Sequence, residues 1–398
     1  MKKRFFAALL SAAFLAAVSA AEPEFSLLVI PTKAVNLEDQ FAGILPNRPP
    51  HLPKVGRVIC GEPFEIAIVF RGAKSRNGAV ELSSRIVMTD PRGEKKELPL
   101  KGNLGKISGD AAGVFLFPQK LRVIYEKKDP KGRYSFGAEL TDGGSGKTAT
   151  ASSAVEYVEK RDPEPGVKAF GKIAAYYREQ DPAYIIPAFR EFLQNLPKQK
   201  AREKNNFNPM PQLAFFYFLL KENPQCVPAF SDLFKQLRGE EKYMAEVVLN
   251  FVSEEAAKAL NTNQRKAVGR QFRTDPFRVE KVAAAWQLDV CWAEFFVRGT
   301  KAPLMKIIAA LSLASDALTI DAYKKLAQPT KEDRRKLLNG LTVMAAQWSL
   351  SSLVKTHPLI RYYTEAALVR GEVKDPVAAA LAAKSVGMKI KIGKNPKP

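Results

Sequence analysis

The chain has 398 residues, of which 46% are hydrophobic and 26% charged, and 62 Lys and Arg against 41 Asp and Glu give a formal net charge of +21. This length suffices for two domains with a sizeable core. Only three cysteines are present, Cys60, Cys226 and Cys291, and so few exclude a disulfide-dense scaffold.

Residues 1–21 have the features of a secretory signal peptide. Three basic residues at 2–4 precede a mostly apolar run and small residues at the expected cleavage site. The run is shorter than the ~20 residues that span a bilayer, which disfavours an uncleaved anchor, and no later stretch is long and apolar enough to span one. We expect an exported protein, periplasmic or extracellular. That compartment permits one disulfide, with Cys226–Cys291 as the pair to test; otherwise the cysteines are small buried apolar side chains.

Residues 22–158 show the patterns of short strands separated by turns. Segment 64–70 alternates large apolar residues with smaller or polar ones, as a strand with one more polar face does. An Asn-Gly dipeptide at 77–78 and the sequences TDPRGE (89–94) and KDPKGRY (128–134) have the residues that tight turns prefer. About seven to nine such strands predict an antiparallel β-sandwich of immunoglobulin-like build, without the tryptophan and second cysteine of antibody-type domains.

Two segments of this domain raise the question of ligand binding. Segment 36–56 is rich in proline and predicts a long irregular loop, which is uncommon unless it binds something or moves. TDGGSGKT (141–148) nearly matches a phosphate-binding loop. However, Thr141 replaces its first glycine, and the segment joins two strands instead of a strand and a helix. We interpret it as a flexible hairpin turn.

EKRDPEPG (159–166) predicts a charged linker, and residues 167–386 then read as helices. Many begin with a polar or small residue followed by proline, because the polar side chain caps free amides and proline loses no hydrogen bond at the first helical position. Such starts lie at residues 181, 223, 275, 302, 357 and 375, and Thr330 with Asp333 resembles a capping box. Their spacing is irregular, so we expect an all-α, irregular solenoid-like or bundle domain. Residues 387–398 form a basic tail, disordered or loosely held.

The most aromatic segment, WQLDVCWAEFF (286–296), falls in a predicted helix that starts at Pro276, with Asp275 as its cap and Gly299 just past its end. Two apolar faces are predicted on it: Val279, Val282, Trp286, Val290, Ala293 and Val297 on one side, and Leu288, Cys291, Trp292 and Phe295 on the other, with Gln287, Glu294 and Arg298 as a polar strip between them. A helix apolar on two sides packs between layers. We therefore interpret it as the centre of the helical domain and not as a cofactor pocket.

Asp289 is the exception, because it projects between these faces, where an unpaired charge is costly to bury. One interpretation is a buried salt bridge or a cap for a neighbouring helix. The other is a carboxyl group with a raised pKa that acts as a general acid or contacts a ligand. The surrounding phrase LDVCWAEFFVRGTKAPLMKII (288–308) resembles uncharacterised bacterial exported proteins with a helical-repeat domain. That resemblance implies no activity.

Positive charge is concentrated in the second half. Residues 22–158 hold 20 basic and 16 acidic residues, whereas residues 159–398 hold 39 and 25. Our candidate binding residues are Asp289 and three basic clusters: Lys198, Lys200, Arg202 and Lys204; Arg265, Lys266, Arg270 and Arg273; Arg334, Arg335 and Lys336. On one face of a curved solenoid they would form a groove for an acidic polymer or protein; scattered, they serve only solubility. Nucleic acid matches the charge but is not expected in an exported protein.

Catalytic motifs are nearly absent. The chain has two histidines, His51 and His357, neither in a recognisable nucleophile setting, and no HExxH, CxxC or GxSxG. We predict no cofactor and no metal. The preferred hypothesis is an exported, non-enzymatic binding or scaffolding protein of the bacterial envelope, with an envelope protein or acidic polymer as its partner. The alternative is a polysaccharide-processing enzyme whose acid is Asp289 or Glu294. A third class is a pure assembly module without a polymer ligand.

Overall fold

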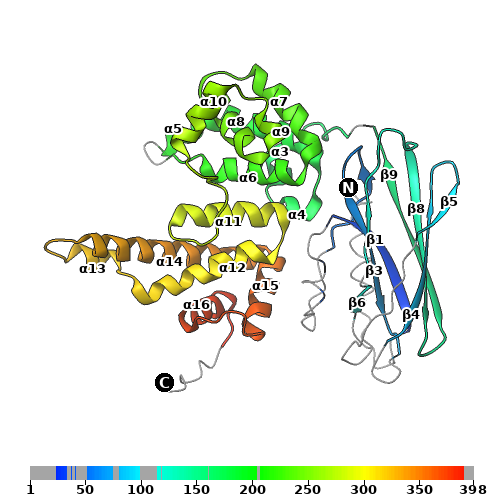
Figure 1. Ribbon diagram of the computed structural model, residues 1–398. Coiled ribbons are helices and arrows are strands. Elements are labelled where there is room, and N and C mark those ends of the chain that lie inside the picture. The colour runs from blue at the N-terminus through cyan, green and yellow to red at the C-terminus, as the bar shows by residue number, and fades with distance from the viewer. Residues whose placement is uncertain are drawn as a thin grey trace. The chain divides into compact units, whose positions relative to one another are not determined.

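A computed structural model describes residues 24–33, 37, 41, 52–74, 80–98, 114–117, 119–159, 161–203 and 207–389. The chain divides into two compact units, residues 1–161 and 162–398. This division falls inside the segment 159–166 that we predicted as a linker. Figure 1 shows strands in the first unit and helices in the second. The predicted signal peptide, the Asn-Gly turn at 77–78, most of the proline-rich segment with His51, and the end of the basic tail lie outside the described residues.

The first unit contains two β-sheets. One has the order β1-β3-β6, with β7 also paired to β3, and all of its pairs are antiparallel. The other has the order β2-β9-β8-β4-β5 and is antiparallel except that β2 runs parallel to β9. The strands are β1 Ser26–Thr32, β2 Arg57–Val58, β3 Phe64–Arg71, β4 Leu82–Thr89, β5 Lys95–Leu98, β6 Val114–Leu116, β7 Leu121–Val123, β8 Gly132–Asp142 and β9 Thr148–Tyr157.

Both sheets contribute to one hydrophobic core. From β3, the predicted inward positions Phe64, Ile66, Ile68 and Phe70 are all buried in it, together with residues of β4, β8 and β9. The predicted polar face of β3 is wrong in the middle of the strand. There Ala67 is fully buried in a second, smaller cluster with Leu37, Leu52 and Leu116, so β3 has apolar neighbours on both faces.

One of the two predicted proline turns forms as expected, in TDPRGE, whereas in KDPKGRY the turn lies before Pro130, where the Asp129 amide donates to the Glu126 carbonyl at 3.0 Å. In TDPRGE the Gly93 amide donates to the Asp90 carbonyl at 3.0 Å, and the Asp90 carboxylate accepts the Glu94 amide at 2.8 Å. TDGGSGKT is a hairpin between β8 and β9, as predicted. Its buried Asp142 carboxylate accepts the Ser145 hydroxyl at 2.5 Å and the Gly144 amide at 3.1 Å. A carboxylate therefore already binds the donors that a phosphate would need.

The second unit is mostly helical. Its elements are α3 Ala169–Ile173, α4 Tyr176–Glu179, η1 Pro182–Tyr184, α5 Ile185–Glu203, α6 Met210–Glu222, η3 Pro224–Cys226, α7 Val227–Gln236, α8 Gly239–Val252, α9 Glu254–Ala257, α10 Thr262–Gln271, α11 Ala285–Arg298, α12 Lys301–Ala310, η4 Leu311–Asp316, α13 Ile320–Lys324, α14 Lys331–Thr356, α15 Pro358–Val369 and α16 Pro376–Val386. Asp181, Asp375 and the Thr330–Asp333 capping box start helices as predicted.

The predicted helix from Pro276 was placed too early, because α11 begins only at Ala285. Asp275 does cap the Phe277 amide, at 2.9 Å, but its other carboxylate oxygen accepts the Tyr217 hydroxyl, also at 2.9 Å. The helix starts where the Gln287 side chain accepts the Ala283 amide at 2.7 Å. Its end is as predicted, since Gly299 has a φ of 64°.

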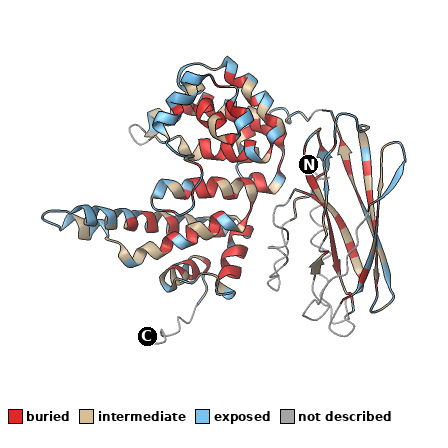
Figure 2. Ribbon diagram, viewed as in Figure 1, coloured by how far each residue is buried: buried red, intermediate tan, exposed pale blue. Residues whose placement is uncertain are grey.

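The interpretation of this segment as part of the core is confirmed, because both of its predicted apolar faces are buried except at Trp286. Leu288, Cys291, Trp292 and Phe295 are each at most 6% exposed. Figure 1 shows α11 between α6 and the pair α12 and α14, and Figure 2 shows its buried residues in red. On the other predicted face the five smaller residues are buried, and the prediction is wrong only at Trp286, which is 41% exposed.

All three cysteines are free, so the Cys226–Cys291 bridge is not formed; Cys226 and Cys291 are buried and Cys60 is half-buried. By length and composition, one stretch of the described residues, Lys301–Lys324, could cross a membrane, a test that the core helix of a soluble protein also passes. The stretch is not one continuous α-helix, because it consists of α12, the 3-10 helix η4 and α13.

Candidate binding surface

Three helices of the second unit meet at one end of the bundle. Lys200, near the end of α5, forms an ion pair with Glu240 at the start of α8. One turn further along α8, the Tyr243 hydroxyl donates to the side chain of Gln271, the last residue of α10. These two contacts place the end of α5, the start of α8 and the end of α10 side by side.

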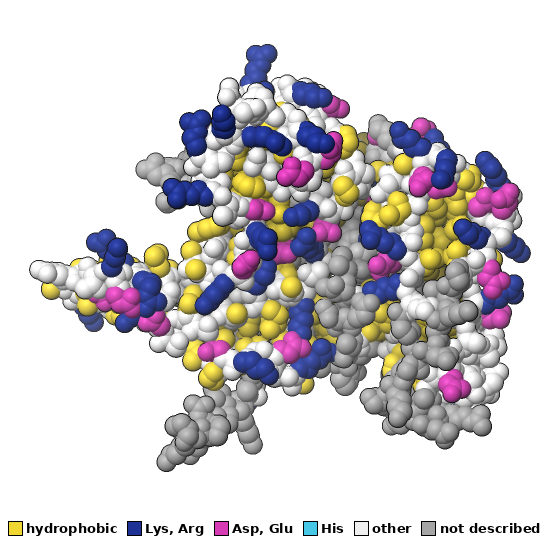
Figure 3. Space-filling model, viewed as in Figure 1, with side chains coloured by type: hydrophobic (Ala, Val, Ile, Leu, Met, Phe, Trp, Pro, Cys, Tyr) yellow, Lys and Arg dark blue, Asp and Glu magenta, His cyan; other side chains and the backbone are white. Residues whose placement is uncertain are grey.

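This arrangement brings together cations that lie far apart in the sequence. We define the cationic end as eight exposed or half-exposed residues: Lys198, Lys200, Arg202, Arg238, Lys242, Lys266, Arg270 and Arg273. The same segments carry three acids, Glu203, Glu240 and Glu241. Figure 3 shows dark blue side chains in excess over magenta ones on the part of the unit that carries α5, α8 and α10.

Most of these cations have no acidic partner. Lys200 pairs with Glu240, and Arg202 pairs with Glu203 at 3.2 Å. The other six form no ion pair with a described residue. Lys242 lies over the Phe234 ring, 5.1 Å from its centroid, a cation–π contact that holds its ammonium group near the surface. Unpaired like charges repel one another, and an acidic ligand would relieve that repulsion.

The sequence of α10 explains why it presents cations without burying them. Asn261 and Gln264 form a capping box that starts the helix, and Val268 is its one buried residue. Just beyond its end, Phe272 packs edge-on against Phe251, with ring centroids 6.3 Å apart. The helix has no acid of its own. At ~100° per residue, Lys266 and Arg270 both project about 160° away from Val268 around the helix.

The structure brings together two of the three predicted clusters. Lys204 lies outside the described residues. Arg265 is held against the protein, because its Nε donates to the Ala257 carbonyl at 3.1 Å. Arg238 and Lys242 were missed, since each is separated from the basic runs in sequence and only the packing of α8 brings them near.

The third cluster is a separate feature. Figure 1 shows the start of α14, where Arg334, Arg335 and Lys336 lie, far from α10. Arg335 pairs with Asp316 and Glu332, and Lys336 lies 3.9 Å from each of the same two carboxylates. The third cluster therefore does not share a surface with the other two.

The prediction that Asp289 is buried between two apolar faces is wrong, because Asp289 is exposed. Asp289 and Trp286 are both near the start of α11, where this side of the helix is exposed, whereas Ala293 and Val297 further along the same side are buried. Asp289 forms no hydrogen bond or ion pair with a described residue, and although the residue is exposed, neighbouring protein atoms desolvate its carboxyl group in part and raise the pKa of that group. Glu294, in contrast, pairs with Arg298 and lies 3.5 Å from Lys306.

His357 belongs to a polar cluster that joins α4 to the junction of α14 and α15. Its Nδ1 lies 3.0 Å from both the Tyr177 hydroxyl and Nη2 of Arg178. The same Arg178 nitrogen donates to the Thr356 carbonyl at 2.9 Å. Burial and the adjacent guanidinium lower the pKa of His357 to about 4. His357 is therefore neutral at pH 7 and acts as an acceptor in a structural joint.

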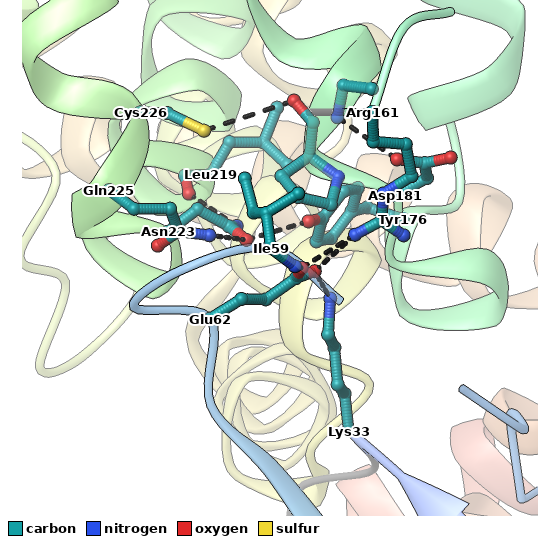
Figure 4. A network of polar contacts seen from close by, with 12 residues as sticks. Lys33, Ile59, Glu62, Arg161, Tyr176, Asp181, Leu219, Asn223, Gln225 and Cys226 are labelled. Carbon is teal, nitrogen blue, oxygen red and sulfur yellow. Dashed lines mark hydrogen bonds and ion pairs between the residues drawn. The ribbon is translucent and has the colours of Figure 1, made fainter. Parts of the chain in front are cut away.

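The first unit has its own buried charge cluster, drawn in Figure 4 together with a hydrogen-bond network of the second unit. Glu62 is fully buried, and its carboxylate accepts Nη2 of Arg161 at 2.6 and 2.7 Å and the Ile59 amide at 2.8 Å. Lys33 forms a further ion pair with it. This carboxylate is saturated with donors, so the cluster has a structural role.

Within the part of the chain that the structure describes, no three His, Cys, Asp or Glu side chains are placed to hold a metal ion.

Comparisons with known proteins add little. No protein-family model matches the chain, and no curated protein matches it. Among solved structures, it is similar to a family 123 glycoside hydrolase from Clostridium perfringens, studied for glycolipid glycan hydrolysis. The similarity has 14% identity and a TM-score of 0.22, and it covers 45% of this chain and 36% of that one. A similarity of this degree carries no argument about fold or activity.

Proposed function

We propose that this chain is an exported, non-enzymatic binding or scaffolding protein of the bacterial envelope, and that its cationic end contacts an acidic polymer or an acidic protein. The observation that carries the proposal is the packing of α5, α8 and α10, which gathers eight cations at one end and leaves six of them without an ion pair to a described residue. Export rests on the predicted signal peptide in residues 1–21.

We further propose an immunoglobulin-like sandwich for the first unit. The strand order β2-β9-β8-β4-β5, with β2 parallel to β9, and the smaller sheet β1-β3-β6 support this assignment. So does Tyr134 at the start of β8, whose hydroxyl donates to the Pro130 carbonyl four residues upstream, at 2.9 Å. Such a tyrosine corner is a recurring feature of these sandwiches. For the second unit we propose an irregular, solenoid-like stack or bundle, since its helices vary from 4 to 26 residues.

A binding role is favoured over glycoside cleavage by the state of the acids on α11. Glycosidases generally need two carboxyl groups that flank one bond. Asp289 and Glu294 are five residues apart on α11, so at ~100° per residue they project about 140° apart around the helix. Glu294 also contacts two cations, Arg298 and Lys306.

The proposal is tested by a pull-down from envelope fractions with the chain from residue 22 onward, at low and at physiological salt. The probe variant is Lys198→Gln/Arg270→Gln/Arg273→Gln, called the cationic-end triple. The control is Lys331→Gln/Arg334→Gln/Lys355→Gln, called the α14 triple, which removes the same charge from exposed positions elsewhere. We expect an acidic ligand to bind the wild type and the α14 triple, and to be lost from the cationic-end triple and at higher salt.

Two results would contradict the proposal. A soluble acidic polymer or protein retained by the cationic-end triple and released by the α14 triple would place the binding site elsewhere. A protein partner that resists salt and ignores both triples would indicate an assembly module that binds through an apolar surface.

A further inference from the structure

Helix α14 exposes a row of large apolar side chains. Leu338, Leu341, Met344 and Trp348 are 56%, 37%, 57% and 75% exposed, and Trp348 is the most exposed large hydrophobic residue that the structure describes. At ~100° per residue the four lie within about 120° of one another around the helix, over ~15 Å of its length. We call these four residues the α14 stripe.

The stripe is held in place and is not the result of a loose helix. The opposite side of α14 is buried through Val343, Ala346, Leu350 and Val354. Trp292 of α11 donates from its indole nitrogen to the Ser349 hydroxyl at 3.1 Å. Asn339 donates to the Asp316 carbonyl at 2.9 Å. These contacts fix the rotation of α14 about its axis, so the apolar stripe faces outward permanently.

Cations border the stripe at both ends. Lys331 and Arg334 precede it and Lys355 follows it. All three are exposed, lie on the same side of the helix at ~100° per residue, and form no ion pair with a described residue. The nearby acids are engaged elsewhere, because Glu332 pairs with Arg335 and Asp333 accepts hydrogen bonds from Thr330. The surface is therefore apolar in the middle and positive at its two ends.

This pattern decides between two occupants. A second copy of the chain paired through the stripe would bring cations against cations, because a two-fold interface matches each patch with itself. An anionic bilayer offers the complementary pattern. Apolar side chains of an amphipathic helix enter the boundary between headgroups and acyl chains, tryptophan favours that interface, and lysine and arginine contact the acidic headgroups.

We propose that the α14 stripe docks on the surface of an anionic lipid bilayer, with α14 lying in the plane of the interface. This goes beyond the function proposed above, because it uses a different surface and ligand from the cationic end. Docking through α14 would hold the protein at a membrane while α5, α8 and α10 contact their own partner.

The test is flotation of the chain from residue 22 onward with vesicles of phosphatidylcholine, with and without phosphatidylglycerol. We expect binding to the anionic vesicles only. Leu341→Ser/Trp348→Ser should weaken it at least about tenfold, because burying these two side chains is worth more than the ~1.4 kcal/mol that a factor of ten represents. Val369→Ser, at another exposed apolar residue (63% exposed), is the matched control and should bind as the wild type does.

Variants that remove charge, and the emission of the tryptophans, provide two independent tests of the docking surface. The α14 triple should lose vesicle binding, whereas the cationic-end triple should keep it. On binding, tryptophan emission should shift to shorter wavelength in wild type and in Trp286→Phe, and should not shift in Trp348→Phe. Absence of binding to anionic vesicles overturns the proposal. So does binding that survives both α14 variants, and so does binding lost from the cationic-end triple alone, which would assign the lipid contact to the other surface.

Discussion

Two groups of charges, one in each unit, are arranged in opposite ways. In the first unit, the carboxylates of Glu62 and Asp142 are fully buried and surrounded by donors from the backbone and from side chains. In the second unit, the cationic end collects charges on the surface, and most of them have no ion pair with a described residue. A buried charge is costly unless it is bonded, whereas an exposed charge costs little. The first arrangement therefore contributes to folding, and the second leaves charge available to a ligand.

From this comparison we expect the largest change in the free energy of unfolding when Glu62 is replaced. Replacement by Ala removes the carboxylate that Lys33, Arg161 and the Ile59 amide all bind, and should lower the free energy of unfolding of the first unit by about 3 to 5 kcal/mol. The measurement is calorimetry, with hydrogen exchange of the β-strand amides to locate the effect.

The control for Glu62 is Glu97→Ala. Glu97 lies 3.4 Å from Arg85, and both side chains are 62% exposed, so its loss should cost less than about 1 kcal/mol. Equal effects of the two substitutions would contradict the distinction between buried and exposed charges.

Within the second unit, alanine substitutions at two glycines should distinguish a packed helix, α14, from an exposed one, α10. A Cβ at Gly340 of α14 would overlap the Leu318 carbonyl oxygen, so Gly340→Ala should destabilise by about 1 to 3 kcal/mol. A Cβ at Gly269 of α10 would meet nothing within 4 Å, so Gly269→Ala should stabilise by about 0.5 to 1 kcal/mol. Urea unfolding followed by tryptophan fluorescence measures both, because all three tryptophans lie in this unit. Shifts of the same sign would show that the packing of α14 is misassigned.

His357 predicts how the second unit responds to acid. Its pKa is lowered to about 4, from 6.5, by burial and by Arg178. The unfolded chain therefore binds a proton that the folded chain does not, and stability that is complete above pH 6.5 is lost as the pH falls towards 4. Because the ring is only half-buried, we expect a loss on the order of 1 kcal/mol.

Urea unfolding between pH 7 and 4 tests this response. His357→Phe should flatten the pH dependence, whereas His51→Asn, which removes the other histidine, should preserve it. If both variants follow the wild type, another group is responsible for the acid sensitivity.

The smallest change in the free energy of unfolding is expected for substitutions at the cationic end. The cationic-end triple removes three exposed charges that repel their neighbours, so the free energy of unfolding should change by less than about 0.5 kcal/mol. Urea unfolding measures it. A large destabilisation would mean that these side chains hold the bundle together and are not reserved for a ligand.

Local chemistry made part of the fold predictable from the sequence. Asp90 and Gly93 fix a turn, and Thr330 with Asp333 fixes the start of α14, because in each case the side chain and the backbone it bonds are within four residues. The same reasoning failed at Asp275, whose carboxylate also binds Tyr217, 58 residues away. A distant partner of this kind leaves no trace in the local pattern.

The candidate site was predictable only in its components. The basic runs of α5 and α10 are evident in the sequence, but their meeting depends on Lys200–Glu240 and Tyr243–Gln271, contacts between helices that no periodicity reveals. Arg238 was missed for the same reason. Asp289 was expected to be buried because the apolar faces beside it are buried, but the helix is exposed near its start, at Trp286 and Asp289.

The most direct test of the central claim is the affinity of the chain from residue 22 onward for inorganic polyphosphate, measured by titration from low to physiological salt. We expect wild type and the α14 triple to bind equally at low salt and to weaken steeply as salt rises. The cationic-end triple should bind far more weakly, with a shallower salt dependence, because fewer charges meet the polyanion. Equal weakening of the two triples would contradict the claim, since it would mean that net charge alone, and not the packing of α5, α8 and α10, governs binding.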